Sequence, residues 1–226
     1  MRGVTVSQSL PSNSTAAVRA MPSRANRWLS HGTVKPTLFV LGCLPAVWLF
    51  WAALNNHLGA NPAEALIRSL GDWSLRFLVL VLAVTPLREL TGWSALARLR
   101  RMIGLFVFFY VCLHLLAYAW FDMGFEGVEI VADVVKRPFI LVGMVSWVLL
   151  VALAATSFNR AIRILGARRW QALHRGVYMV AVLAVLHFFW MRSGKNDFAD
   201  VAVYASLLGA LLAWRLWRRF RLRARH

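Results

Sequence analysis

The chain has 226 residues, of which 60% are hydrophobic and 15% are charged, and it carries a formal net charge of +17. Soluble domains are about one-quarter charged, so this composition excludes an ordinary soluble protein and indicates a polytopic membrane protein. The length allows about six spans of roughly 20 residues each. The basic residues cluster between apolar runs rather than along one amphipathic face, so we expect no nucleic-acid partner.

Residues 1–36 are rich in Ser, Ala, Arg and Pro and show no hydrophobic periodicity. Such a composition predicts a flexible N-terminal tail. No apolar run of the length found in secretory signals precedes Lys35. We therefore do not expect a cleaved signal peptide.

Six apolar segments follow this tail and predict an all-α membrane helix bundle with six transmembrane helices. The second segment is short for a span unless the preceding residues LIRSLGDW join it. Pro86 and Arg88 are expected to mark its end. The bundle occupies residues 37–217, and residues 218–226 form a basic C-terminal tail. The approximate cores of the segments are 37–54, 74–87, 104–121, 138–156, 172–190 and 201–217.

The distribution of charge predicts the orientation of the bundle. Of the 26 basic residues, 19 lie near the two chain ends and in the connections 88–101 and 157–171. The connections 55–73, 122–137 and 191–200 carry five basic residues but eight of the nine acids. Basic connections stay in the cytoplasm, so we expect both termini to be cytoplasmic. The opposite face is acidic and offers a surface to a partner protein.

Several common cofactor motifs are missing from the sequence. There is no GxGxxG, GxxxxGK[ST] or CxxCH motif, so the local signatures of dinucleotide, ATP and covalent heme sites are not found. Cys43 and Cys112 both fall inside predicted spans, so a disulfide framework is not implied. Any cofactor is therefore expected to be held by residues that the fold brings together.

Three histidines, His114, His174 and His187, lie within apolar stretches. An ionisable side chain at membrane depth is costly and marks a functional site, and imidazole is a common axial ligand of heme iron. His114 is roughly 18 Å into the third span, and His187 is about 20 Å beyond His174 along the fifth. His114 and His187 should therefore share a level at which they can hold one iron. His174 lies at a second level, suited to a second redox site.

Other interpretations of the histidines stay open at this point. Buried histidines often serve as hydrogen-bonded packing residues between helices. They also form proton relays in transporters, although the chain lacks a pair of broken spans in corresponding halves. On a straight helix His174 and His187 point about 140° apart, so both face the interior only if the helix is surrounded or bends. We expect no cofactor role for His31, His57 or His226.

Three segments together resemble one protein family. They are RRMIGLFVFFYVCLH (100–114), DVVKRPFILVGMVSWVLLVALAATS (133–157) and RRWQALHRGVYMVAVLAVLHFFW (168–190). The combination is similar to the heme-binding membrane subunits of bacterial periplasmic methionine sulfoxide reductase systems, the MsrQ family, which belongs to the ferric-reductase-like transmembrane group. The resemblance covers roughly residues 37–217.

This resemblance implies an electron-transfer subunit of the bacterial inner membrane that carries heme b and FMN. It implies delivery of electrons to a periplasmic, molybdopterin-containing methionine sulfoxide reductase subunit, from quinol or from a flavin reductase. A ferric or other metal reductase is the alternative. The wider group has a second histidine in the third span, where this chain has Arg100 or Arg101. The partner of His174 is therefore open: a second heme, a flavin or a quinone.

The arginines near the inner level are the remaining candidates for cofactor binding. Arg101 and Arg175 are expected to pair with heme propionates or an FMN phosphate, because the guanidinium group matches such anions. Membrane topology and attraction to anionic lipids explain most of the other arginines in these connections.

Overall fold

The computed structural model describes residues 24–194 and 196–224, and the regular secondary structure of that part of the chain is helical. Six segments are long and apolar enough to cross a membrane, which confirms the predicted six-helix bundle. Residues 1–23, most of the predicted flexible tail, lie outside the described residues. The spans are α2 (Val34–Leu54), α3 (Pro62–Thr91), α4 (Arg100–Phe121), α6 (Pro138–Ala155), α7 with α8 (Asn159–His174 and Val177–Ser193) and α9 (Ala199–Arg223).

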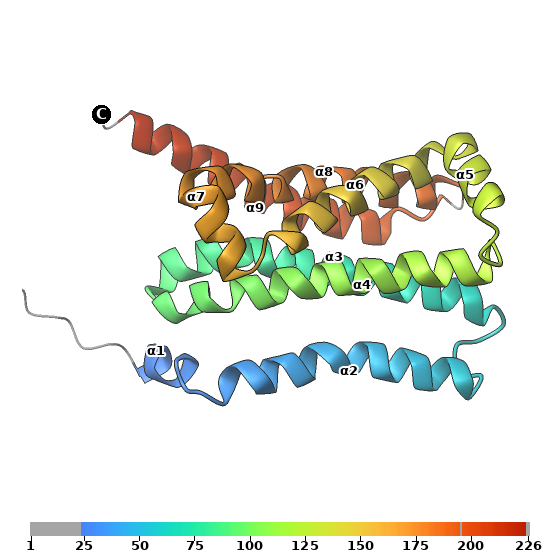
Figure 1. The fold of residues 1–226 in the computed structure, drawn as a ribbon, viewed down its shortest axis with the longest axis horizontal. Helices are drawn as coiled ribbons and strands as arrows, with labels where there is room; N and C mark the ends of the chain where they lie inside the picture. The colour runs from blue at the N-terminus through green and yellow to red at the C-terminus, as the bar shows by residue number, and fades with distance from the viewer. Residues whose placement is uncertain (1–23, 195, 225–226) are drawn as a thin grey trace, which may run out of the picture.

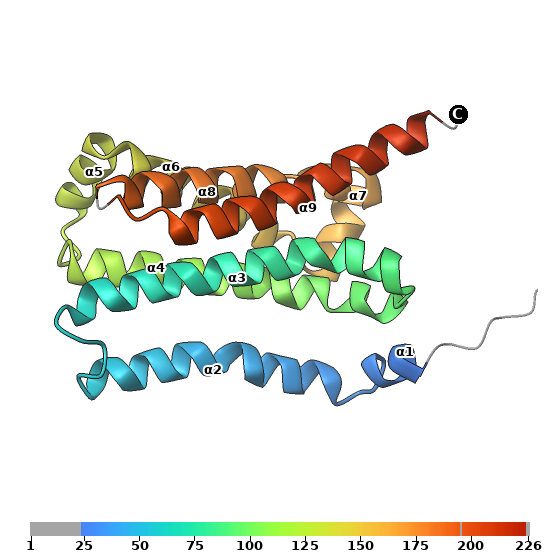
Figure 2. The ribbon, with the colours of Figure 1, turned by 180° about the vertical axis from the view of Figure 1, so that it is seen from behind.

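The helices pack in three tiers (Figure 1). The middle tier is α3 with α4, which pack most extensively on each other; α6, α8 and α9 cover one side of it, and α2 lies on the other. The view from behind shows the same arrangement (Figure 2). The start of α2 and the end of α9 lie at the same end of the bundle, as an even number of spans requires.

The two ends of the bundle differ in charge. We call the end with α1, α7 and the last turns of α9 the basic end, and the end with α5 and the α2–α3 and α8–α9 connections the acidic end. Eight of the nine acids in the sequence lie toward the acidic end: Glu64, Asp72, Asp122, Glu126, Glu129, Asp133, Asp197 and Asp200. The ninth, Glu89, forms an ion pair with Arg218 at the basic end.

Helix α3 is longer than its predicted core. Its first turn is capped by the Asn61 side chain, which accepts a hydrogen bond from the Glu64 N–H at 3.2 Å. It ends at Gly92, whose φ of +71° suits the left-handed helix cap. The expectation that Pro86 marks its end is wrong. Proline leaves the carbonyl four residues earlier without a donor, and Arg215 of α9 donates to that Leu82 oxygen at 3.0 Å.

Helix α2 is attached to the middle tier by small residues and one tyrosine. The Tyr110 hydroxyl donates to the Gly42 carbonyl at 2.8 Å and accepts from the Ala46 N–H at 3.0 Å, beside Pro45 within α2. A Cβ atom at Gly42 would lie 2.5 Å from the Phe106 ring, so only glycine permits this approach. Tyr110 thus links α2 to the core that holds the sites described below.

Three connections that we predicted as loops or tail contain further helices. α1 (Arg24–Leu29) lies in the predicted tail, and α5 (Gly127–Lys136) lies in the loop 122–137. α7 occupies the predicted loop 157–171 and kinks at Gly166, whose φ is +75°. A short 3₁₀ helix, Ser94–Arg98, packs against α1. These helices are short or strongly charged, so a search for long apolar runs does not detect them.

The fifth span is not the continuous helix predicted over 172–190. α7 ends at His174 and α8 begins at Val177, with a tight turn between them in which the Gly176 N–H donates to the Leu173 carbonyl at 2.8 Å. His174 and Arg175 therefore lie at this junction rather than inside one straight helix. The predicted angle of about 140° between His174 and His187 assumed one straight helix. Because the chain turns between α7 and α8, that angle does not apply.

Candidate cofactor sites

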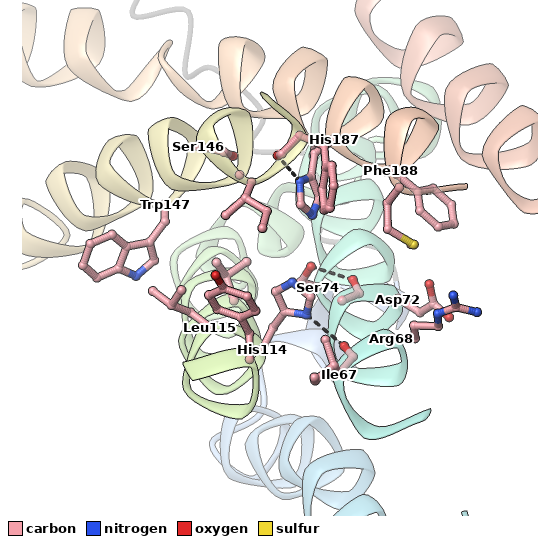
Figure 3. A pocket seen from close by; sticks show the side chains of 18 of the residues that line it. Ile67, Arg68, Asp72, Ser74, His114, Leu115, Ser146, Trp147, His187 and Phe188 are labelled. Carbon is pink, nitrogen blue, oxygen red and sulfur yellow. Dashed lines mark hydrogen bonds between the residues drawn. The ribbon is translucent and has the colours of Figure 1, made fainter. Parts of the chain in front are cut away.

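His114 of α4 and His187 of α8 face each other within the bundle (Figure 3). Their ring centres are 6.2 Å apart and their ring planes are nearly perpendicular, at 88°. The structure thus brings together the two residues that were predicted to share a level. His114 belongs to the middle tier and His187 to the tier that covers it, so the space between the two rings lies between these tiers.

Each of these imidazoles is fixed by a main-chain carbonyl. The Nδ1 atom of His114 lies 2.8 Å from the carbonyl oxygen of Ile67 in α3, and the Nδ1 atom of His187 lies 2.6 Å from that of Phe139 in α6. A carbonyl oxygen only accepts hydrogen bonds, so Nδ1 carries the proton in both rings. The Nε2 atoms are then the ones with a free lone pair, and they point into the space between the rings (Figure 3).

Two glycines give the rings room to adopt these positions. A Cβ atom at Gly143 of α6 would lie 3.0 Å from the His187 ring, and one at Gly71 of α3 would lie 3.3 Å from the His114 ring. Both distances are shorter than ordinary van der Waals contact. Each histidine therefore packs against a glycine on the helix that also supplies its carbonyl anchor.

A cavity of about 450 Å³ contains both rings; we call it the outer pocket. Apolar side chains of α4, α6 and α8 form its walls, and the buried indole N–H of Trp147 has no hydrogen-bond partner among the described residues. Its polar groups gather toward the acidic end of the bundle, where Tyr118, Asp122 and Arg137 lie. The pocket is thus apolar inside and polar at its mouth, as many cofactor sites are.

A hydrogen-bonded network crosses this mouth. The Tyr118 hydroxyl donates to Asp133 of α5 at 2.6 Å, and Arg137 binds the same carboxylate through Nε at 2.5 Å and through a second nitrogen. Burial alone would raise the pKa of the Asp133 carboxyl, but the hydrogen bonds from Arg137 and Tyr118 outweigh it and lower that pKa. The same pairing raises the pKa of Arg137. The network fixes α5 over the outer pocket.

His174 lies in a second cavity of about 450 Å³ toward the basic end; we call it the inner pocket. Its ring stacks on Trp170, with centres 4.1 Å apart, and its Nε2 atom lies 3.1 Å from the Thr156 hydroxyl. The Trp170 indole N–H donates to the Thr156 carbonyl at 2.8 Å. Thr156 therefore holds both aromatic rings in place at the end of α6.

Arg101 and Arg175, the two predicted cofactor-binding arginines, also line the inner pocket. Arg101 donates to the Asn159 side-chain oxygen at 2.8 Å. The structure therefore brings His174, Arg101 and Arg175 to one cavity, separate from the cavity of His114 and His187.

The remaining histidines have other surroundings. His31 lies 2.9 Å from the Thr33 hydroxyl, and His57 stacks on Trp51. His226 lies outside the described residues. No group of three or more His, Cys, Asp or Glu side chains that could hold a metal ion occurs among residues 24–194 and 196–224.

Sequence reasoning missed several residues that shape these sites. Among them, only Gly71 and Gly143 could have been noticed in the sequence, because an isolated glycine in an apolar helix often marks close packing. Thr156 and Arg215 could not, because their roles depend on which helices become neighbours. The carbonyl anchors at Ile67 and Phe139 are independent of side-chain type and cannot be found from sequence.

The chain is similar to one family model and to several curated proteins. The model of the ferric reductase like transmembrane component matches residues 70–185. A "protein-methionine-sulfoxide reductase heme-binding subunit MsrQ" from Polaromonas naphthalenivorans is 60% identical over 84% of this chain and 87% of its own length. Proteins of the same name from Bordetella pertussis and Rhodospirillum rubrum are 53% and 51% identical over 88% and 79% of this chain, and over 98% and 85% of their own lengths.

No solved structure matches the chain. The family match covers about half of the sequence and includes His114 and His174, and the curated relatives extend the similarity over most of the remainder. The chain therefore belongs to the MsrQ family, within the ferric-reductase-like transmembrane group.

Proposed function

We propose that this protein is the membrane electron-transfer subunit of a methionine sulfoxide reductase system. In this proposal His114 and His187 would hold a heme b in the outer pocket. The observation that carries the proposal is the pair of facing imidazoles, with ring centres 6.2 Å apart and each fixed through Nδ1. The names of the relatives, which describe them as heme-binding subunits, support it.

The residues of the outer pocket fit a heme. A metal–imidazole bond is about 2 Å long and each ring adds roughly 1 Å from its nitrogen to its centre, so two axial imidazoles place their centres about 6 Å apart. The observed 6.2 Å agrees with this spacing. Two histidines without a third ligand suit a porphyrin, which supplies the other four donors, better than a bare metal ion.

A bound heme supplies one-electron chemistry at this position, and the protein sets its conditions. The Ile67 and Phe139 carbonyls keep the Nδ1 protons of His114 and His187 in place, which presents both Nε2 lone pairs to the iron. Apolar side chains surround the two rings inside the pocket. The unpartnered indole N–H of Trp147 is available to a polar group of the cofactor.

The charge of the two ends supports an orientation of the protein in the membrane. We propose that the basic end faces the cytoplasm and the acidic end faces the periplasm of a bacterial inner membrane. The outer pocket then opens toward a periplasmic, molybdopterin-containing reductase subunit, which accepts the electrons for repair of oxidised methionine. The name of the relatives as reductase subunits supports such a partner.

The inner pocket is the proposed entry point for electrons. His174, Arg101 and Arg175 line it at the end where a quinol or a reduced flavin such as FMN would arrive. Its single histidine is held through Nε2 by Thr156, in contrast to the Nδ1 anchors of the outer pair. We propose that these residues would hold a second redox group, which would supply one-electron chemistry at this end of the bundle.

A pyridine hemochrome assay with protein quantitation tests the proposal. We expect b-type heme in the purified protein, and complete loss of the low-spin spectrum of the outer site in His114→Ala and in His187→Ala. Persistence of that spectrum in both variants contradicts the ligand assignment. His57→Ala is the matched control, because His57 lies in a connection and stacks on Trp51.

A second experiment distinguishes methionine sulfoxide repair from reduction of metal ions, the activity that the name of the matched family model suggests. The purified protein is first reduced, and the rate at which its heme is reoxidised is then measured with each acceptor. We expect its heme to be reoxidised by the periplasmic reductase subunit with a sulfoxide substrate much faster than by a ferric chelate. Rapid reoxidation by the ferric chelate alone supports a metal reductase instead.

A further inference from the structure

Helix α5 presents an apolar face that the described part of the chain leaves open. Val128, Val131 and Val135 recur at helical spacing along this face, and they are 82%, 65% and 76% exposed. We call these three residues the valine stripe. Ile130 and Val134, on the other side of the same helix, are half-buried. An exposed apolar patch beside charged residues is typical of an interaction site.

The direction in which the valine stripe points is fixed by hydrogen bonds. Asp133 accepts from the Tyr118 hydroxyl at 2.6 Å and from Arg137, so this side of α5 is attached to the bundle. At 3.6 residues per turn, Asp133 points about 140° to 200° away from the three valines. Helix α5 crosses the acidic end of the bundle (Figure 1, Figure 2). The stripe therefore faces away from the bundle, and α5 cannot rotate to bury it without breaking these bonds.

The valine stripe lies beyond the hydrocarbon layer of the membrane. Helix α4 has 22 residues and is thus about 33 Å long, whereas the hydrocarbon layer is about 30 Å thick. Trp120, near the end of α4, and Phe125, just after it, are exposed and have ring centres 5.5 Å apart. Such aromatic residues are typical of the headgroup level. Because α5 begins only at Gly127, contact with lipid tails does not explain its exposed valines.

The charges around the stripe favour a protein over a lipid surface. Helix α5 has two acids, Glu129 and Asp133, and one basic residue, Lys136. The preceding turn adds the exposed Asp122 and Glu126. Helices that lie on a bilayer surface are rich in Lys and Arg, which attract anionic lipids. The surroundings of the valine stripe have mainly the opposite charge, and they are complementary to a protein surface that carries Lys or Arg.

We propose that the valine stripe is the docking surface for the periplasmic reductase subunit. The stripe fits an apolar depression on that subunit with Lys or Arg at its edge. This inference rests on the proposed function and adds the surface of contact to it. The inner side of α5 is bonded to Tyr118, which lines the outer pocket. A partner on the stripe is therefore separated from that pocket by about one helix diameter, roughly 10 Å.

Reoxidation kinetics test whether the stripe binds the reductase subunit. The reduced full-length protein is mixed with increasing concentrations of that subunit and a sulfoxide substrate, and the rate of heme reoxidation is recorded. In Val131→Glu we expect the half-saturating concentration of the subunit to rise about tenfold or more, because an acid replaces an apolar contact. Val131→Ile should retain docking. Ile164→Glu is the matched control, since Ile164 is 73% exposed on α7 at the basic end.

The acids beside the stripe give a second kinetic readout. Glu126→Gln combined with Glu129→Gln should slow association with the reductase subunit and make it less sensitive to salt, because exposed charges mainly steer the encounter. The heme spectrum of the outer site reports in each variant whether the bundle is folded.

A spin label at position 131 identifies what covers the stripe. Val131→Cys is labelled with a nitroxide in a protein that also carries Cys43→Ala and Cys112→Ala, the replacements of its two cysteines. In lipid nanodiscs we expect the label to be accessible to a water-soluble nickel chelate. Addition of the reductase subunit should immobilise the label and reduce that access.

Three results would overturn the inference. One is an unchanged half-saturating concentration in Val131→Glu. Another is a label that is accessible to oxygen but not to the nickel chelate, which would mean that lipid covers the stripe. The third is dipolar broadening of the label without the reductase subunit, which would mean that a second copy of this chain covers it. In each case the proposed function stands if the subunit still reoxidises the heme of the unmodified protein. Failure of that reaction in the unmodified protein rejects the function itself.

Discussion

The outer and inner pockets have similar volumes, but their histidines are held by different hydrogen-bond partners. In the outer pocket, main-chain carbonyls of α3 and α6 fix two rings through Nδ1, and glycines on the same helices make room for them. In the inner pocket, one ring is held through Nε2 by a hydroxyl and stacks on Trp170. The outer pocket is thus arranged for paired axial ligation, whereas the inner pocket combines one imidazole with several cations.

This comparison shows that the residue type alone does not determine what a buried histidine does. The nitrogen that is engaged by the protein determines which nitrogen is left for a ligand. A carbonyl anchor fixes the tautomer because it can only accept. The Thr156 hydroxyl donates its one proton to the Ala152 carbonyl at 2.8 Å, so it accepts from the Nε2–H of His174. His174 therefore leaves Nδ1 for a ligand, whereas His114 and His187 leave Nε2.

The largest expected difference between the pockets concerns loss of the histidines themselves. His114→Ala and His187→Ala each remove one of the two proposed axial ligands and should abolish the low-spin heme spectrum of the outer site. His174→Ala should leave that spectrum in place and slow its reduction by a donor. Optical difference spectra of the three variants measure this, and equal loss of the outer spectrum in all three contradicts a division into two sites.

The next effect tests the glycines that give the outer rings their room. Gly143→Ala should displace the His187 ring, because the added Cβ would lie 3.0 Å from it, and Gly71→Ala should act more weakly at 3.3 Å. We expect a lower heme content and a shifted spectrum, although alanine favours a helix by up to about 1 kcal/mol. Gly209→Ala is the control, because its Cβ would meet nothing within 4 Å. An unchanged heme content in Gly143→Ala would refute the close-packing role.

A smaller effect is expected from the residues that support His174. Thr156→Val removes the hydroxyl beside Nε2 while keeping the shape of the side chain, and should slow reduction of the outer heme by reduced FMN about tenfold. The outer heme spectrum itself should not change. Thr91→Val is the control, because it removes an exposed hydroxyl that donates to the Leu87 carbonyl and accepts from the Trp93 N–H, away from both pockets. A shift of the outer spectrum in Thr156→Val would show that the two pockets are not independent.

The smallest predicted effect concerns the network at the mouth of the outer pocket and its pH dependence. The pKa of Asp133 is lowered below its usual 3.8 in the folded protein. Its carboxylate therefore stabilises the fold above that pH, and the stabilisation is lost as the pH falls through the lowered pKa. Asp133→Asn should reduce stability at pH 7 by about 1 kcal/mol, and thermal unfolding at lower pH should show this difference shrinking below pH 3.8.

The matched control for that experiment is Glu129→Gln, an exposed carboxyl on the same helix α5. It should change stability little at any pH, since exposed charges contribute little. A stability difference between Asp133→Asn and the unmodified protein that is the same at pH 7 and pH 3 would mean that the carboxylate charge is not what holds the network together.

Much of the bundle could be predicted from the sequence, because membrane spans are long apolar runs. The number of spans and the shared level of His114 and His187 followed from run lengths and from the helix rise. The break between α7 and α8 could not be predicted in this way, because no apolar run ends at Gly176. The continuation of α3 through Pro86 also could not be predicted, because it depends on a donor from Arg215, 129 residues further along the chain.

The same limit applies to the sites. Histidines at membrane depth are visible in the sequence because they are costly there, so the candidate ligands could be named. Their anchors are carbonyls or hydroxyls on other helices, and the convergence of Arg100 and Arg215 on Thr85 joins α3, α4 and α9. These contacts depend on which helices pack together, which spacing within one helix does not reveal.

The most direct test of the outer site is low-temperature electron paramagnetic resonance of the oxidised, purified protein. Perpendicular axial imidazoles interact with different iron d orbitals and leave them close in energy, so the ring angle of 88° predicts a strongly anisotropic low-spin ferric signal. That signal should vanish in both His114→Ala and His187→Ala. A high-spin ferric signal in the unmodified protein, or a low-spin signal that survives both substitutions, would contradict axial ligation by this pair.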